Sequence, residues 1–414
     1  MAKFGIALGS GPRGLGFESR YSDHKPAFTS VDAGFLTLFK TGDSIMLKKI
    51  QNFMAKETVL CVAAACALLT MFLVPPDQEY LHYIDFRVLC LLLCLMAVVA
   101  GLKSVGLFHW LTYQLLYRIH SGRALSVTLV MLPFFSSMFV TNDVALIIFI
   151  PFTLMLLDQL GCRRSIIPIT VFQTIAANLG SMATPVGNPQ NLYLYAFYNL
   201  GIGEFFSVTL PLTAISFILL AAASIPLLPK KLPYQPLEET GIRSKRHLLL
   251  YLTLFLLCLL TVFRVIPYPV TTAITVVALF LADRKLLKEI DYMLLLTFVC
   301  FFTVSENLGR VDAICAFLQR LLGASTLLTA VGTSQIISNV PAAVVLSGFT
   351  NQWQDMLSGV NIGGLGTPIA SLASLITIKF YMRWPKTKIL PFLGFFTAFN
   401  IVFLAILLLF VWII

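Results

Sequence analysis

The stretch Asn178-Leu-Gly-Ser-Met-Ala-Thr-Pro185 interrupts an otherwise apolar segment, and its N-x-G-x-x-x-T-P pattern returns as Asn361-Ile-Gly-Gly-Leu-Gly-Thr-Pro368. A second polar break lies upstream of each copy, Thr141-Asn142-Asp143 in the first half and Ser338-Asn339-Val340 in the second. Glycine lacks a Cβ atom and proline lacks an amide donor, so each copy is expected to break a helix and leave backbone groups free. Matched breaks in two hydrophobic halves predict the binding site of a repeat-built transporter.

The composition is that of a membrane protein. Of the 414 residues, 58% are hydrophobic and only 12% are charged, whereas a soluble domain carries about 25% charged residues. The apolar runs reach the roughly 20 residues that a helix needs to cross a bilayer. The formal net charge of +10 comes largely from basic residues in short loops, where they mark the cytoplasmic side of the membrane. This placement argues against a nucleic-acid partner and for the lipid bilayer.

Residues 1–45 differ from the rest of the chain because they lack a continuous apolar run. Nothing in them has the charged start and apolar core that predict a signal peptide. One hypothesis is that translation starts at Met46, because Gly16-Phe17-Glu18-Ser19 can be encoded by GG-TTC-GAA-TC, the T-arm of a transfer RNA gene. The alternative is a genuine disordered tail.

The distribution of Lys and Arg predicts an all-α polytopic membrane protein with about nine transmembrane spans and two re-entrant helical hairpins. Lys48, Lys49 and Lys56 precede the first span and place the N-terminus in the cytoplasm. The stretches 124–157 and 322–350 are expected to form the hairpins, because each is an apolar run with a polar tip and the first has basic residues on both flanks. Non-helical backbone at such a tip is tolerated at membrane depth only where protein or water surrounds it. The spans are expected at about 54–74, 85–101, 165–200, 206–228, 247–265 and 268–282, from 291 onward, across 361–368, and at 389–413.

The chain divides into two transmembrane repeats. We expect an N-terminal extension (1–45), a first repeat with the first span and a cytoplasmic-side hairpin (46–228), a cytoplasmic linker (229–246), and a second repeat with an outer-side hairpin (247–414). Ile84-Asp85-Phe86 opens the second span, and Ile290-Asp291-Tyr292 opens the seventh. Three landmarks therefore recur in the same order in both halves: Ile-Asp-aromatic, Ser/Thr-Asn and N-x-G-x-x-x-T-P. The charge pattern places Asp85 outside and Asp291 inside, which predicts inverted topology and brings the hairpin tips together near the midplane.

The predicted substrate site is neutral and polar. Half-helix N-termini suit anions, whereas free carbonyls and Asn or Thr oxygens suit cations. The alternative is that Asn and Ser only join neighbouring helices, which is common in membrane bundles; their matched positions favour binding. The predicted substrate-binding residues are Thr141, Asn142, Asn178, Thr184, Asn188, Ser338, Asn339, Asn361 and Thr367, and the predicted helix breaks are Gly180, Pro185, Gly187, Gly363, Gly366 and Pro368.

Asp143 is the charged residue of the first hairpin tip, and its counterpart in the second tip is Val340. A carboxylate at membrane depth is costly unless it is paired, protonated or bound to a cation. We therefore predict that Asp143 couples transport to protons or sodium. Sodium, bound at the predicted site residues, is the only metal that we expect, and we expect no cofactor. The alternative is that Asp143 caps the second hairpin helix. Glu306 and Arg310, one helical turn apart, are expected to form a structural ion pair.

At these residues the chain resembles the ion transporter superfamily, which includes divalent anion/sodium symporters, citrate transporters, arsenite permeases and sodium/proton antiporters. The resemblance covers about residues 54–414 and rests on Thr141-Asn142, Ser338-Asn339 and the two N-x-G-x-x-x-T-P breaks. Dicarboxylate transporters carry Ser-Asn-Thr in each hairpin, whereas Thr141-Asn142-Asp143-Val-Ala-Leu is closer to arsenite permeases and citrate-transporter-like permeases. That branch implies an anion or oxyacid exchanged with, or driven by, protons, and the superfamily implies a homodimer.

The sequence thus predicts a secondary active transporter in the cytoplasmic (plasma) membrane that moves a small citrate-like, dicarboxylate-like or arsenite-like solute, coupled to protons or sodium. A sodium/proton antiporter of the same superfamily and an uncoupled anion channel are the alternatives. An enzyme is disfavoured because His82, His109, His120 and His247 lie at span ends and the chain has no HExxH, GxSxG or P-loop pattern.

Overall fold

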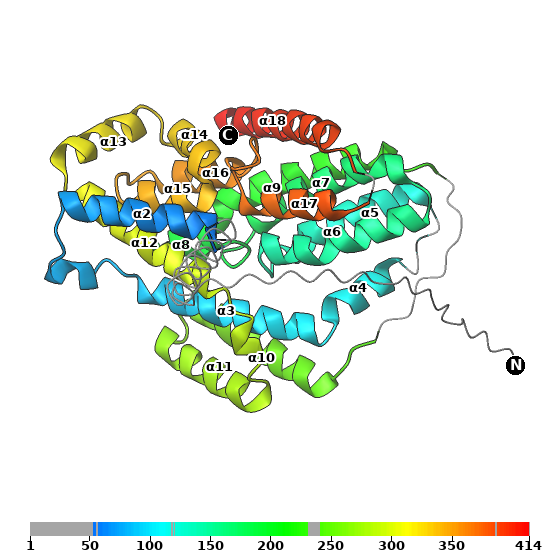
Figure 1. The fold of residues 1–414 in the computed structure, drawn as a ribbon, viewed down its shortest axis with the longest axis horizontal. Helices are drawn as coiled ribbons and strands as arrows, with labels where there is room; N and C mark the ends of the chain where they lie inside the picture. The colour runs from blue at the N-terminus through cyan, green and yellow to red at the C-terminus, as the bar shows by residue number, and fades with distance from the viewer. Residues whose placement is uncertain are drawn as a thin grey trace, which may run out of the picture. The chain divides into compact units, whose positions relative to one another are not determined.

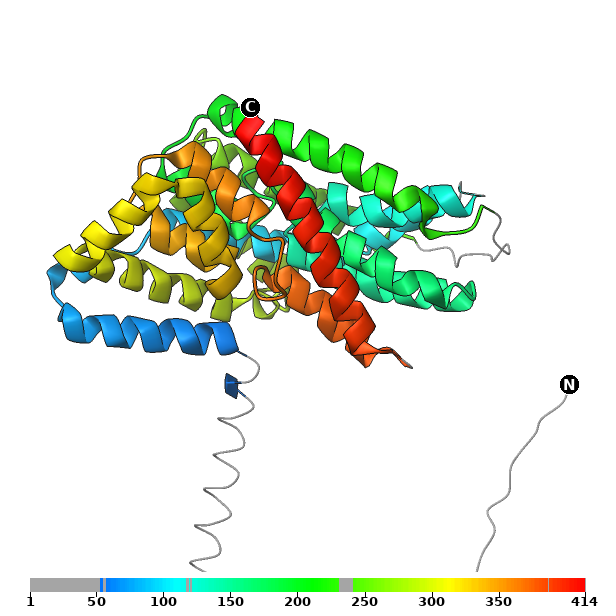
Figure 2. The same cartoon turned by 90° about the horizontal axis from the view of Figure 1, so that it is seen from above.

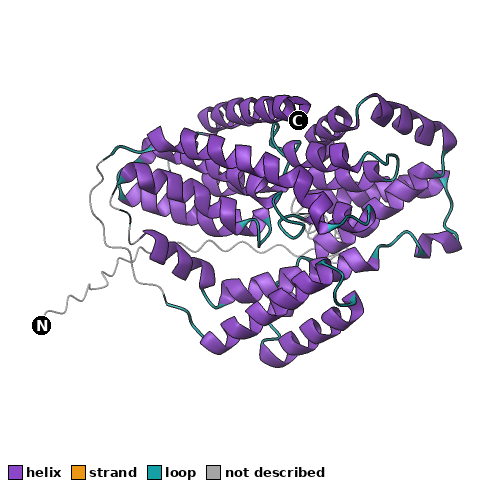
Figure 3. Cartoon of the chain, turned by 180° about the vertical axis from the view of Figure 1, so that it is seen from behind, coloured by secondary structure: helices purple, strands orange, loops and turns teal. Residues whose placement is uncertain are grey.

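The computed structural model describes residues 53–54, 57–116, 119, 121–230, 241–385 and 387–413. Residues 59–414 pack as one unit (Figures 1 and 2), and the secondary structure of the described residues is helical throughout (Figure 3). This confirms the all-α prediction for the described part of the chain. The predictions for residues 1–45 lie outside the described residues, as does most of the expected linker, at 231–240.

The long helices follow one another in two series. The first series is α2 (Thr58–Leu73), α3 (Phe86–Ser104), α4 (Leu107–Leu116), α5 (Gly122–Ser136), α6 (Asn142–Gln159), α7 (Ile166–Ser181), α8 (Pro189–Phe197) and α9 (Ile202–Ser224). The second series is α10 (Lys245–Val262), α11 (Tyr268–Ala282), α12 (Tyr292–Gly309), α13 (Asp312–Ala324), α14 (Thr326–Ile337), α15 (Asn339–Ser347), α16 (Trp353–Ile362), α17 (Leu372–Arg383) and α18 (Ile389–Ile413).

Six helical segments of the described residues are long and apolar enough to cross a membrane, or seven if the bent pair α13–α14 counts as one span. The chain is therefore a multi-pass membrane protein. The six are Gln78–Ser104, which contains α3, then α6, Ile202–Leu227, which contains α9, and α10, α12 and α18. The broken helix α7 is not among the six. Its 16 residues cover only about 24 Å of a hydrocarbon core about 30 Å thick. The count of nine spans, which includes broken helices, stays a prediction.

Both stretches predicted as hairpins contain a pair of helices joined at the expected polar tip. In the first, α5 and α6 are joined by residues 137–141; in the second, α14 passes into α15 at Ser338. The second pair is shorter than the predicted stretch 322–350, because residues 312–324 form the separate helix α13, bent by 116° from α14. Ser325 causes this division: its backbone is extended, and its side chain accepts a hydrogen bond from the Leu328 amide to cap α14.

The helices α3 and α12 begin in the same way. The Asp85 carboxylate accepts a hydrogen bond from the Val88 amide at 3.0 Å, and the Asp291 carboxylate accepts one from the Leu294 amide at 2.9 Å. A capping carboxylate satisfies an amide that has no partner within its helix. After each of these helices come, in the same order, a short helix, a helix pair, a broken helix and a long helix.

The two series are interlocked rather than side by side. The second helix of each pair packs on the second half of the broken helix in the other series, α6 on α17 and α15 on α8. Likewise, α18 contacts α7 and α9 contacts α16, and Figure 1 shows α18 along the upper edge of the molecule, next to α9 and α7 of the first series. This exchange of partners brings the polar ends of the broken helices together.

Candidate functional site

The two broken helices meet where their first halves end. Asn178 lies in the last turn of α7, and its Oδ1 atom accepts hydrogen bonds from Asn142 Nδ2 and from Ser371 Oγ, each at 2.9 Å. Its Nδ2 atom donates to the Gly364 carbonyl at 3.4 Å. Asn142 belongs to the hairpin tip of the same half, whereas Ser371 and Gly364 belong to the other half. Asn178 therefore connects one hairpin tip with both breaks.

Asn361, at the end of α16, also accepts a hydrogen bond from the other half, although its donor contacts differ from those of Asn178. Its Oδ1 atom accepts from Asn188 Nδ2 at 3.2 Å, and its Nδ2 atom donates to Asn191 Oδ1 at 2.7 Å. Asn188 follows Asn178 by ten residues, and Ser371 follows Asn361 by ten residues. Each break asparagine thus accepts a hydrogen bond from the equivalent position of the other half. We call these residues, with Asn142, the amide network.

The amide network is buried and fixes the start of the second half-helices. Asn142, its most exposed asparagine named above, is only 5% exposed. The Asn188 side chain accepts from the Asn191 amide at the start of α8, and the Ser371 side chain accepts from the Ala373 amide at the start of α17. Two half-helix N-termini, which carry partial positive charge, therefore begin inside the network.

The threonines of the repeated motif hold each break against its own hairpin. Thr184 Oγ1 donates to the Met138 carbonyl, and Thr367 Oγ1 donates to the Gln335 carbonyl at 3.1 Å. Met138 precedes Asn142 by four residues, and Gln335 precedes Asn339 by four. These hydroxyl groups are engaged with backbone, so their position favours a role in shaping the site.

Several glycines of the breaks have no room for a Cβ atom, and Gly180 and Gly366 show how this arises in each half. A Cβ atom on Gly180 would lie 2.1 Å from the Phe134 carbonyl oxygen, so the first break depends on close approach of α7 to α5. Gly366 has a φ of 109°, a conformation that favours glycine, and a Cβ atom there would lie 2.2 Å from Gln335 Oε1. The other predicted break residues, Pro185, Gly187, Gly363 and Pro368, lie in the same two connections.

The second hairpin tip lies beside the second break. The Asn339 amide donates to the Ala370 carbonyl at 2.9 Å, and a Cβ atom on Gly364 would lie 2.8 Å from Asn339 Nδ2. Ser338 has φ 77° and ψ 155°, a conformation that costs a non-glycine residue of the order of 1–3 kcal/mol and that clusters at binding sites. Its hydroxyl contacts the Ala370 carbonyl at 3.3 Å.

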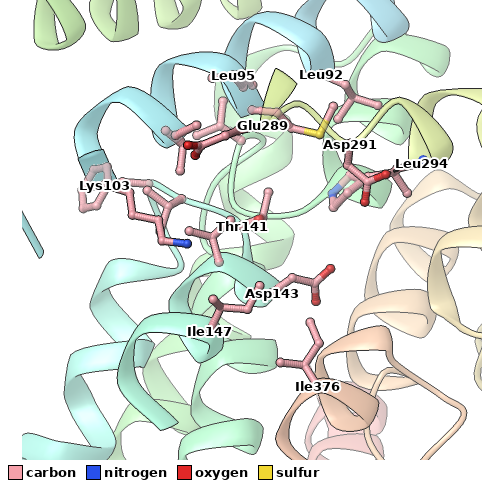
Figure 4. Close-up of a pocket in the computed structure, with 18 residues that line it drawn as sticks. Leu92, Leu95, Lys103, Thr141, Asp143, Ile147, Glu289, Asp291, Leu294 and Ile376 are labelled. Carbon is pink, nitrogen blue, oxygen red and sulfur yellow. Dashed lines mark hydrogen bonds between the residues drawn. The ribbon is translucent and has the colours of Figure 1, made fainter. Parts of the chain in front are cut away.

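Asp143 lines a cavity of about 300 Å³ (Figure 4), and the residues of the amide network are not among those that line it. Thr141 occupies the N-cap position of α6, and Asp143 Oδ1 is buried with no hydrogen-bond partner among the described residues. The capping alternative therefore does not account for this side chain. The residues predicted as one site therefore do not all meet. Asn142, Asn178, Asn188 and Asn361 belong to the neutral amide network, and Thr141 lines the charged cavity with Asp143. Thr184, Thr367, Ser338 and Asn339 join the hairpins to the breaks.

Several polar residues of this region were not predicted. Ser371 could have been found, because it stands ten residues after Asn361 as Asn188 does after Asn178. Asn191 and Gln335 carry no comparable signal. The expected pair of Glu306 and Arg310 was wrong: Arg310 pairs with Asp77 at 2.7 Å and Glu79 at 3.5 Å, because the loop before α3 brings those carboxylates to the end of α12.

Interlocked broken helices around a buried polar centre define the class as a multi-pass membrane transporter. The model of the citrate transporter family (CitMHS) matches residues 45–352, and the chain belongs to that family. It is similar to the uncharacterized transporter MJ0456 of Methanocaldococcus jannaschii, with 32% identity over 78% of this chain and 88% of the relative. It is also similar to the inner membrane protein YbiR of Escherichia coli, with 29% identity over 72% and 80%.

A shorter similarity links the chain to the silicon efflux transporter LSI3 of Oryza sativa, with 31% identity over 33% of this chain and 28% of the relative. The predicted resemblance to citrate-transporter-like permeases is confirmed at the level of the family. The names of these relatives agree with a transporter rather than an enzyme.

Proposed function

We propose that the protein is a secondary active transporter of the plasma membrane that moves a small anion or oxyacid coupled to protons or sodium. The observation that carries the proposal is the reciprocal pair of hydrogen bonds, Ser371 to Asn178 and Asn188 to Asn361. Equivalent positions of two halves that meet across a central axis support two inverted repeats at 46–228 and 247–414. The basic residues before the first span support an N-terminus inside.

The amide network is the proposed solute site. Its asparagine side chains bond mainly to one another and to backbone carbonyls, so a solute with several oxygens would replace bonds that the two halves otherwise make together. The N-termini of α8 and α17 begin there and favour negative charge. The proposed substrate-binding residues are Thr141, Asn142, Asn178, Thr184, Asn188, Ser338, Asn339, Asn361 and Thr367, of which the two break threonines act by holding the hairpins.

Asp143 is the proposed coupling residue. Its buried oxygen has no partner, and a carboxylate at this depth is stable only when it is protonated, paired or bound to a cation. Binding and release of a cation at Asp143 next to Asn142, whose Oδ1 atom accepts from the Asp143 amide at 3.0 Å, would reach the solute site through one residue.

A sodium/proton antiporter is the second candidate. The observation that favours it is the same unpartnered carboxylate, together with an amide network that is already hydrogen-bonded without a solute. An antiporter would use the cavity at Asp143 and leave the amide network as a structural crossing. An uncoupled anion channel lacks a reason for Asp143.

The test is flux into proteoliposomes of the purified chain with succinate, citrate, arsenite, silicic acid and sodium in turn, with and without a pH gradient. Silicic acid is included because of the name of the rice relative. We expect uptake of one oxygen-rich solute that depends on a proton or sodium gradient, and loss of that dependence in Asp143→Asn. Asp158→Asn, at the other end of α6, removes a carboxylate paired with Arg163 and should keep it.

Gradient dependence that survives in Asp143→Asn would remove Asp143 from the coupling mechanism. Solute flux that no gradient accelerates would favour the channel, and sodium flux without any solute would favour the antiporter. We also propose a homodimer, which the family resemblance supports. The mass of the purified protein in detergent tests this directly.

A further inference from the structure

The cavity beside the first hairpin tip carries charges on its rim. Asp143 lies inside it, and three exposed charged residues line its edge: Lys103 at the end of α3, and Glu289 and Asp291 just before α12. In Figure 4 these side chains surround the space next to Thr141 and Asp143. Three carboxylates and one ammonium leave the fully ionised cavity with an excess of negative charge.

The other walls of the cavity add no titratable group. Two residues of the first break, Val186 and Pro189, and Ile376 of α17 complete it, and the remaining lining residues are apolar. Clefts lined by one sign of charge between apolar walls concentrate ions of the opposite sign. The negative rim therefore favours entry of cations over anions.

We propose that this cavity is a cation-selective entrance through which a proton or sodium ion reaches Asp143, with Glu289 and Asp291 setting its charge selectivity. This inference rests on the proposed coupling role of Asp143. In the predicted topology Asp291 lies on the cytoplasmic side, so the entrance opens to the cytoplasm. The entrance explains how Asp143, whose Oδ1 atom is buried without a hydrogen-bond partner in the described part of the chain, exchanges its cation with solution.

The other half of the chain provides a matched control. Asp85 caps α3 as Asp291 caps α12, with nearly equal distances to the capped amides, but Asp85 does not line the cavity. Asparagine at either position keeps a capping oxygen. Asp291→Asn and Asp85→Asn therefore remove the same charge from the same local structure, and only the first should change the entrance.

The experiment measures which reagents enter. Val144 lines the cavity next to Asp143, and Val144→Cys places a thiol there; Ile147→Cys, one turn further along α6, is a second reporter if the first variant fails to fold. The purified protein is treated with a cationic trimethylammonium-ethyl or an anionic sulfonatoethyl methanethiosulfonate. Peptide mass spectrometry reads the new cysteine separately from the native ones, and free cysteine gives the intrinsic ratio of rates.

We expect the cationic reagent to be favoured by about tenfold over its ratio with free cysteine, the lower end of electrostatic steering. Glu289→Gln with Asp291→Asn should bring the ratio close to that of free cysteine, and Asp85→Asn should leave it unchanged. Equal rates for both reagents, or a ratio that the two rim substitutions do not change, would overturn the proposal.

A second comparison identifies the cation. Replacing sodium by N-methylglucamine at equal ionic strength should speed labelling if sodium occupies the cavity, whereas a dependence on pH alone, after correction for the thiolate fraction, indicates protons. An effect of neither would also overturn the proposal. Labelling rates do not require solute movement. The labelling assay therefore tests the entrance, and the flux assay with Asp143→Asn tests the coupling role separately.

Discussion

Replacing Asn178 by alanine tests the hydrogen bonds between the two halves. The substitution removes two accepted bonds and one donated bond, which are worth about 0.6 kcal/mol each in membrane proteins on average. It also leaves the buried Asn142 amide without the acceptor that it uses, which adds about 1 kcal/mol. We expect Asn178→Ala to lower the free energy of unfolding by about 3 kcal/mol.

The assay is unfolding in mixed micelles titrated with sodium dodecyl sulfate, followed by intrinsic fluorescence. Asn400→Ala is the matched control, because Asn400 is also buried. Among the described residues its side chain donates only to Phe396 in its own helix, and its Oδ1 atom has no partner. That control should change the free energy of unfolding by less than about 1 kcal/mol. Equal losses in the two variants would refute the reasoning.

A double-mutant cycle isolates the bond between the halves. Asn178→Ala combined with Ser371→Ala should show a coupling energy of about 0.6 kcal/mol and not more than about 1.7 kcal/mol. The cycle compares residues 193 positions apart in the chain, so local helix effects cancel. A coupling energy indistinguishable from zero would mean that the bond between these side chains does not form in the folded protein.

Two further predictions concern the first break and the loop before α3. Gly180→Ala should lower the free energy of unfolding by about 3 kcal/mol, because the new Cβ atom would lie 2.1 Å from the Phe134 carbonyl oxygen. Gly203→Ala, which meets open space in α9, should raise it by about 0.5 kcal/mol. The same unfolding titration measures both variants. The hydrogen bond from Arg310 holds the pKa of Asp77 below its ordinary value of 3.8. Because the pKa of Asp77 is lower in the folded protein than in the unfolded chain, its ionised side chain stabilises the fold at pH values above the unfolded pKa. This stabilisation is lost as the pH falls through the folded pKa. The gap in melting temperature between the native chain and Asp77→Asn should therefore close below about pH 4. A gap that persists in acid would contradict this origin.

The helices and their breaks could be predicted because apolar runs, glycine and proline act locally. The expected break at 178–188 matches the end of α7 at Ser181 and the start of α8 at Pro189, and both hairpin tips fall at a helix start. Helix α13 escaped prediction because its 13 residues are too mixed in composition to read as a span and too apolar to read as a loop. Its separation from α14 occurs at Ser325, whose extended backbone and capping side chain start a new helix.

The partners within the site could not be predicted, because they depend on how helices from distant parts of the chain cross. The sequence grouped Asn142 and Asp143 in one site, but successive residues on a helix point about 100° apart, so one joins the amide network and the other faces the cavity. Arg310 shows the same limit. Helical spacing favoured Glu306 as its partner, whereas the folded loop supplies Asp77.

The hydrogen bonds that join the two halves at Asn178 and Asn361 are equivalent, but the charge at the two hairpin tips is not. Alternating access requires two conformations of similar energy, and two halves that make equivalent bonds at Asn178 and Asn361 are suited to exchange their roles at little cost. Asp143 breaks that equivalence, because Val340 stands at its position in the other tip. In the proposed coupling role of Asp143, a bound cation would make the two tips electrically alike, and its departure would leave one tip charged. The energy difference between the two conformations would then depend on the cation, and its gradient would be linked to movement of the solute.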